Sequence, residues 1–406
     1  MPTHPLSGPL VGVRVVELAG IGPAPFAAML LADLGADVLR VDRPGGNAMA
    51  PAPPPYDLLT RGRPSVAVDL KHPDGVQVVL DLVAGADVLI EGFRPGVTER
   101  LGLGPDECLG VNPALVYGRM TGWGQDGPLA RTAGHDLTFL AVTGALSTIG
   151  EAGRPPQPPL NLLGDFGGGA LYLAVGVLAA LLEARGSGRG QVVDACVVDG
   201  TAHLTAMVVG QLAAGWWQDR RGSNLLDGSA PFYTTYVCAD GRELAIAPME
   251  PQFWAAFVAG LALADDPDLP DRADHAQWGA LRRVLGDRIA TRTQAQWLEV
   301  FDCSDACVAP VRSLAEAAAD PHLVARGTFV EHAGVVQPAP APRFSRTPGA
   351  LTAPPPLGAG ADTREALTVW GIEDVDALIA SGAVVQDAGP SDGPAGAYAA
   401  AQHTGG

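Results

Sequence analysis

The chain has 406 residues, enough for two or three domains at about 150 residues each. Its 44 acidic and 26 basic residues give a formal charge of −18, which argues against partners such as nucleic acid or an anionic membrane surface. The only lysine, Lys71, stands in a polar turn and no P-loop motif is present, so neither pyridoxal chemistry nor P-loop ATP hydrolysis is expected.

Cysteine usage and the N-terminus indicate the compartment. The five cysteines include no C-x-x-C pair, so we expect reduced, structural thiols and a cytoplasmic protein. The first residues lack the charged and apolar regions of a signal peptide. The longest apolar run, residues 166–182, starts at a glycine triplet and is predicted to be a buried core helix rather than a membrane span.

Short β-branched runs alternate with helical patterns over the first 200 residues. The strands are expected at residues 13–18, 38–42, 66–69, 88–91, 115–120 and 191–196. Helical patterns follow most of them, including one after Pro73 and a long apolar one at about 167–183. Strands that alternate with helices predict an α/β fold, with a mainly parallel, doubly wound sheet in one large domain.

The pattern changes near residue 232, where two β-rich runs flank Asp240-Gly241 and predict a tight hairpin. Capping-box patterns at Thr293 and Ser313 predict two helix starts in a smaller α+β domain. Residues 338–356 are proline-rich and predict an extended connector. The predicted organisation is a large domain at 1–198, a linker helix at 199–226, the small domain at 227–315, a return to the large domain at 316–385, and a disordered tail at 386–406.

The turn after the first strand contains Gly20-Ile21-Gly22, close to the dinucleotide-binding pattern, and Asp42 lies where a ribose-binding acid would stand. Pro25 occupies the third glycine position, where close packing between helix and strand requires no ring. A nicotinamide cofactor is therefore considered and disfavoured.

Basic residues gather in the first 100 positions, mostly near the carboxyl ends of predicted strands, where doubly wound sheets bind ligands. Each could be a solvated surface charge, but the group favours binding of a polyanion with phosphates. The residues are Arg40, Arg43, Arg61, Arg63, Lys71, Arg94 and Arg100.

Three residues are candidates for acid-base chemistry. His135 stands at the start of an apolar helix, where it either hydrogen-bonds locally or exchanges protons near neutrality. Asp165 is either an N-cap or a functional carboxylate, and the glycines after it, Gly167, Gly168 and Gly169, would leave backbone N–H groups open for an anionic oxygen. Glu250, taken by itself, is interpreted as a carboxylate in the first turn of a helix.

Taken in order, these motifs resemble the family III CoA-transferases, and most closely the racemases of α-methylacyl-CoA within that family. The resemblance covers most of the chain to about Val385. The matching segments are residues 14–23, 33–38, 94–102, 120–125, 134–136, 164–169, 227–228, 250–253, 307–311 and 342–347.

The resemblance implies a Rossmann-like large domain, a small domain and a homodimer of interlocked chains, with acyl-CoA between the large domain of one subunit and the small domain of the other. It implies that His135 and Glu250 work as a pair on one face of the substrate and that Asp165 faces the other. The CoA contacts it implies are Arg43, Arg94, Arg61 and Lys71. No metal and no cofactor beyond the CoA of the substrate is expected.

The expected reaction is racemisation of 2-methylacyl-CoA thioesters at the α-carbon by proton transfer through an enolate, with backbone N–H groups of residues 167–169 on the thioester oxygen. The alternative enzyme is a CoA-transferase in which Asp165 is a covalent nucleophile. A non-catalytic acyl-CoA-binding protein would account for the arginines but not for the three acid-base candidates.

Overall fold

The computed structural model describes residues 6–47, 52–53 and 55–387. The described chain divides into two compact units. The first is drawn from Met1–Phe139, Asn161–His203 and Gly327–Gly406, and the second is Leu140–Leu160 with Leu204–Arg326. Each unit is described by itself.

The first unit contains a seven-stranded sheet in the order β12-β3-β2-β1-β4-β5-β6. All neighbouring strands are parallel except β12, which runs antiparallel to β3. The strands are β1 (Arg14–Leu18), β2 (Asp37–Asp42), β3 (Ser65–Val68), β4 (Val88–Glu91), β5 (Val116–Thr121), β6 (Gln191–Cys196) and β12 (Val384–Val385). The prediction of a parallel-dominated α/β sheet is confirmed.

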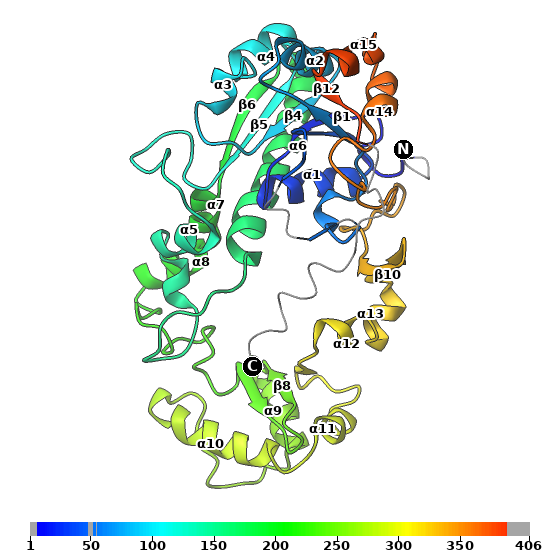
Figure 1. The fold of residues 1–406 in the computed structure, drawn as a ribbon. Coiled ribbons are helices and arrows are strands. Elements are labelled where there is room, and N and C mark those ends of the chain that lie inside the picture. Colours follow the sequence, from blue (N-terminus) through cyan, green and yellow to red (C-terminus); the bar gives the residue numbers. More distant parts are fainter. Residues whose placement is uncertain (1–5, 48–51, 54, 388–406) are drawn as a thin grey trace, which may run out of the picture. The chain divides into compact units, whose positions relative to one another are not determined.

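Helices cover both faces of this sheet (Figure 1). On one face, α1 (Pro23–Asp33) and α6 (Leu171–Ser187) form a core with alternate strand residues such as Val15 and Val38. On the other, α2 (Pro73–Ala84), α4 (Pro105–Val111), α14 (Thr363–Val369) and α15 (Val375–Ser381) pack on the strand residues between, such as Val16 and Leu39. Burial on both faces explains why these strands are continuous β-branched runs.

The helix that includes α6 begins earlier than the sequence pattern indicates. A π-helical segment, η3 (Leu162–Ala170), runs directly into α6. The combined helix, Leu162–Ser187, is the one described helix that is long and apolar enough to cross a membrane, but α6 contacts β5 and β6 as a core helix does.

The second unit has a three-stranded antiparallel sheet in the order β7-β8-β9. The strands are β7 (Thr234–Val237), β8 (Glu243–Ile246) and β9 (Val308–Pro310). The helices α9 (Pro251–Gly260), α10 (Trp278–Ile289) and α11 (Gln294–Val300) share one apolar core with them. The Asp240-Gly241 hairpin and both capping boxes, at Thr293 and Ser313, are present.

The remaining elements are short. They are α3 (Val97–Arg100), α5 (Asp136–Val142), α7 (Val197–Leu204), α8 (Ala206–Ala213), α12 (Leu314–Ala317), α13 (Pro321–Arg326), β10 (Phe329–His332), β11 (Val335–Pro338), and the 3-10 turns η1 (Leu58–Thr60), η2 (Ala145–Thr148) and η4 (His275–Gln277). The β10–β11 hairpin lies within residues 316–385, the segment predicted to return to the large domain.

The unit boundaries differ from those predicted. Residues 140–160 belong to the smaller unit, where Arg221 donates hydrogen bonds to the carbonyls of Ser147 and Glu151 at 2.7 and 3.2 Å. The longer segment of that unit is Leu204–Arg326, whereas the small domain is predicted at 227–315. Nearly all of the tail predicted to be disordered, from residue 388, lies outside the described residues.

Candidate active site

A pocket of about 300 Å³ opens in the first unit at the carboxyl ends of β1 and β4. Its walls are the turn after β1, the turn after β4, the loop after β5, and the side chains of His135 and Asp165. The strand order reverses direction between β1 and β4, and such a switch point is where open α/β sheets bind ligands. The fold therefore brings two of the three acid-base candidates into one cavity.

Asp165 is held on the π-helical segment η3, whose N-cap residue is Asn161. Asp165 is thus inside the helix and not its cap. Its backbone N–H donates a 2.7 Å hydrogen bond to Oδ1 of Asp136. Burial raises the pKa of Asp165 to about 6, and the negative charge of Asp136 adds to that rise. This carboxyl group can therefore hold or release a proton near neutral pH.

The turn after β1 approaches the same carboxylate closely. A Cβ built on Gly22 would lie 3.2 Å from Oδ2 of Asp165, and the φ of Gly22 is +70°. Both the space and the backbone conformation favour glycine at this position. The first residues of α1, from Pro23 onwards, follow directly, so the positive end of this helix adjoins the pocket.

His135 immediately precedes α5, and Thr138 fixes its backbone. The N–H of His135 donates to Oγ1 of Thr138 at 3.0 Å, and that hydroxyl donates to the carbonyl of His135 at 2.7 Å. The residue is exposed and lines the pocket. The ring lies near enough to Asp165 that its positive charge opposes the rise in the pKa of the carboxyl group.

Two glycines and two aromatic rings support the loop that carries His135. A Cβ on Gly122 would lie 1.9 Å from the ring of Phe139, and one on Gly134 would lie 2.4 Å from the same ring. Trp123 meets Phe139 edge to face with ring centroids 4.8 Å apart. No role was predicted for Phe139 or Asp136, although the Gly134-His135-Asp136 triplet indicated where the site lies.

The three glycines after Asp165 do not have the open N–H groups that the sequence suggested. In a π-helix each N–H donates five residues back, so those of Gly167, Gly168 and Gly169 are bonded within η3. Packing explains two of them, because a Cβ on Gly168 would lie 2.4 Å from Oγ1 of Thr201 and one on Gly169 would lie 3.1 Å from Val197. These N–H groups are therefore left out of the proposed site.

Glu250 belongs to the second unit, and its surroundings are given within that unit. It is the N-cap residue of α9, with φ −76° and ψ 152°, and Pro251 takes the first helical position. Its side chain is exposed and makes no capping hydrogen bond. The Glu250 carboxylate therefore does not cap α9.

The basic residues separate into buried and exposed groups. Arg61 is buried, and its guanidinium bonds to Asp33, to Oε1 of Gln337 and to the carbonyl of Pro338. It thus joins α1 to β11, and we leave it out of the CoA site. By contrast, the side chains of Arg94, at the pocket, and Lys71, after β3, are exposed.

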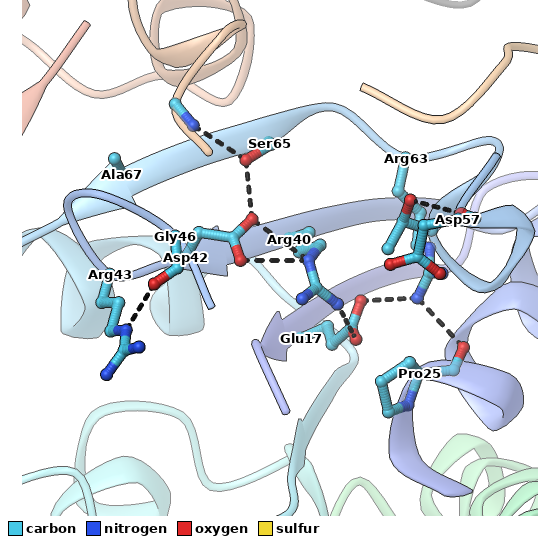
Figure 2. Close-up of polar contacts among 12 residues, drawn as sticks. Glu17, Pro25, Arg40, Asp42, Arg43, Gly46, Asp57, Arg63, Ser65 and Ala67 are labelled. Carbon is cyan, nitrogen blue, oxygen red and sulfur yellow. Dashed lines mark hydrogen bonds and ion pairs between the residues drawn. The ribbon is translucent and has the colours of Figure 1, made fainter. Parts of the chain in front are cut away.

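Figure 2 shows a network of buried charges at the carboxyl ends of β1 and β2 and at the start of β3. Glu17 accepts from Arg40 at 2.8 Å and from Arg63 at 2.6 Å, and Arg63 also donates to the carbonyl of Pro25 in α1 at 3.2 Å. Arg43 is exposed at the margin of this network, where its Nε donates to the carbonyl of Gly46. Arg40 and Arg63 therefore neutralise buried carboxylates, and Arg43 stays available to a ligand.

Metal chemistry has no obvious site in the part of the chain that the structure describes. No group of three or more His, Cys, Asp or Glu residues is placed there to hold a metal ion. The site offers acid-base groups and cations.

Comparisons with known proteins find relatives over most of the chain. The family model for CoA-transferase family III matches residues 10–363. The α-methylacyl-CoA racemase of Mus musculus is 45% identical over 370 residues, which cover 91% of this chain and 95% of that protein. The racemase of Homo sapiens is 44% identical over 342 residues, covering 84% and 87%. The crystal structure of a CAIB/BAIF family protein from Brucella suis matches with a TM-score of 0.78 at 28% identity, covering 90% of this chain and 100% of that one.

Proposed function

Because the chain is an enzyme that belongs to CoA-transferase family III, we propose that it racemises 2-methylacyl-CoA thioesters at the α-carbon. The observation that carries the proposal is that His135 and Asp165 line one pocket at the switch point of the sheet. The similarity to α-methylacyl-CoA racemases directs the choice of substrate.

The reaction needs a base on one face of the α-carbon and an acid on the other. One group removes the α-proton, and the C–H electron pair moves into the thioester carbonyl to form an enolate. The other group then protonates the α-carbon from the opposite face, which inverts the configuration. A pKa of about 6 lets Asp165 serve as base for one enantiomer and as acid for the other, with His135 in the opposite role.

The enolate oxygen needs positive potential close by. The start of α1 at Gly22, Pro23 and Ala24 lines the pocket, and its helix dipole places partial positive charge there. We assign stabilisation of the enolate to this helix end instead of to the glycines of η3.

The exposed cations supply the CoA contacts. Arg94 lines the pocket, and Arg43 and Lys71 are exposed beyond the ends of β2 and β3, as binding of CoA phosphates requires. The proposed site needs no metal and no cofactor beyond the CoA of the substrate.

The family resemblance further implies an interlocked homodimer in which Glu250 supports His135, and we adopt both as proposals. Leu171, Val175 and Leu182 of α6 are large apolar side chains left exposed on a single chain, which supports burial in a dimer. All five cysteines are unpaired, which supports a reducing, cytoplasmic location.

The deciding experiment uses (2R)-2-methylacyl-CoA in D₂O without an acceptor acid. Deuterium should enter the α-position as optical purity is lost, and the substrate should remain a CoA thioester. Asp165→Asn should abolish racemisation, since an amide cannot carry the proton. Retained α-hydrogen in this experiment, with CoA transfer in a second experiment to which a carboxylic acid is added, would refute racemisation.

The second candidate is a CoA-transferase in which the Asp165 carboxylate attacks the thioester. Its place in the pocket is compatible with that role. Attack by the carboxylate would release CoA thiolate and leave an acyl–aspartyl anhydride, and the thiolate would then attack the aspartyl carbonyl, releasing the acyl group as a carboxylate and leaving an aspartyl-CoA thioester. Hydroxylamine or borohydride trapping separates the two reactions. A CoA thioester recovered on Asp165 would establish the transferase, whereas turnover without an adduct supports the racemase.

A further inference from the structure

The backbone just before Glu250 is bonded to an arginine that is distant in sequence. Glu250 follows the loop after β8, and Pro248 and Met249 precede it. Nη1 of Arg272 donates to the carbonyl of Pro248 at 3.0 Å and to the carbonyl of Met249 at 3.1 Å. One guanidinium nitrogen thus holds the two peptide groups that lead into Glu250.

Arg272 is itself fixed by aromatic side chains. Its guanidinium carbon lies 5.3 Å from the ring centroid of Phe232 and 5.1 Å from that of Trp254. Nε1 of Trp278 donates to the carbonyl of Arg272 at 2.8 Å, and Trp278 packs edge to face on Phe232. The cation therefore has a set position over two ring faces, where cation–π attraction stabilises it.

Partial burial of the Arg272 guanidinium costs free energy unless other groups replace the water that it loses. Burial lowers the pKa of Arg272, and no ion pair between Arg272 and a carboxylate occurs among the described residues. Its positively charged guanidinium instead donates to two neutral carbonyl groups just before α9, those of Pro248 and Met249. The Glu250 side chain makes no capping bond, so the direction in which it projects is set by the backbone that Arg272 holds.

We infer that Arg272 is the positioning residue for Glu250, fixing the loop from which this carboxylate reaches its partner. The inference rests on the proposed function, in which Glu250 supports His135. Arg272 touches no reacting atom in this scheme, and it acts through Glu250 alone.

The chain offers a matched control on the same helix. Nε of Arg288 donates to the carbonyl of Leu261, the C-cap residue of α9, at 2.6 Å. Arg272 and Arg288 thus make the same kind of bond at opposite ends of α9, and only Arg272 is bonded next to Glu250. A purely structural role would give the two arginines similar effects.

The test measures kcat and KM for racemisation, with thermal unfolding as a check on folding. Arg272→Gln should lower kcat by about tenfold to a hundredfold and leave KM within about twofold, because a small misplacement of a working group costs that much. Arg272→Lys, which keeps a cation and a donor over the rings, should recover part of the loss. Arg288→Gln should keep kcat within about twofold.

Coupling to Glu250 is measured with the double variant. Arg272→Gln should cause no further loss of α-proton exchange in a Glu250→Gln background. The inference would be overturned if Arg272→Gln lowered α-proton exchange as much in the Glu250→Gln background as in the wild type. Equal effects of Arg272→Gln and Arg288→Gln would overturn it as well. If Arg272→Gln does not fold, Arg272→Lys decides, and unchanged kcat in that variant would overturn the inference as well.

The experiment also separates this inference from the proposed function. Full activity of Glu250→Gln would show that Glu250 has no role in the reaction and would overturn the inference, but it would leave the proposed racemase activity unaffected. Loss of activity in Glu250→Gln with wild-type kcat in both Arg272 variants would overturn the inference alone.

Discussion

The charge of Asp136 should raise the pH at which the enzyme begins to lose activity in acid. The pKa of Asp165 rises from 3.8 to about 6, with burial the largest cause and Asp136 the second. Asp136→Asn removes the charge and keeps an oxygen to accept the 2.7 Å bond from the N–H of Asp165. Since Asp136 is a smaller cause than burial, its removal should lower the pKa of Asp165 by about one unit, or about 1.4 kcal/mol.

The sign follows from the proton count of the working pair. His135 and Asp165 together must hold one proton, on either group, because the two arrangements serve the two enantiomers. Activity therefore falls in acid when both are protonated, and it falls in base when neither is. Removal of a negative neighbour favours the ionised form of Asp165, so the acid limb moves to lower pH.

The assay is kcat/KM for α-proton exchange from pH 4.5 to 8, with each enantiomer as substrate. Both enantiomers should give the same bell-shaped profile in the wild type, and Asp136→Asn should shift its acid limb down by up to about one unit. Asp106→Asn, an exposed carboxylate in α4, is the control for loss of a charge. An unmoved or upward-shifted acid limb in a folded Asp136→Asn protein would refute the reasoning.

Three further predictions concern packing, buried charge and CoA binding. Gly168→Ala places a Cβ 2.4 Å from the buried hydroxyl oxygen of Thr201 and should lower the free energy of unfolding by about 2 kcal/mol. Gly186→Ala in α6 is the control, because a Cβ there would have no atom within 4 Å, and equal denaturation midpoints for the two variants would contradict the prediction. Glu17→Gln leaves the buried guanidinium groups of Arg40 and Arg63 without their shared carboxylate and should lower the free energy of unfolding by about 3 kcal/mol. The exposed Glu299→Gln should change it little, and a Glu17→Gln protein as stable as the wild type would disprove the prediction. Arg94→Ala should raise KM severalfold at low salt and less at high salt, with kcat nearly unchanged; the same KM as the wild type at low salt would remove this residue from the CoA site.

Local sequence patterns were sufficient for the secondary structure of the sheet and for the helix starts. The strand predicted at 88–91 is β4, that at 191–196 is β6, and the others lie within one residue of the predicted bounds. The capping boxes at Thr293 and Ser313 formed because their bonds join residues three apart, which no distant packing needs to arrange. Family membership could also be predicted, because the ordered motifs span most of the chain.

The fate of each charged side chain was decided only by the tertiary structure. Arg61 and Arg94 look alike in sequence, but Arg61 meets Asp33, 28 residues away, and Arg94 faces the pocket. Arg63 likewise meets Glu17 across 46 residues. The pKa of Asp165 and its place beside His135 also come from long-range packing. Burial and the nearest countercharge depend on which segments fold together, and no local pattern of residues encodes that.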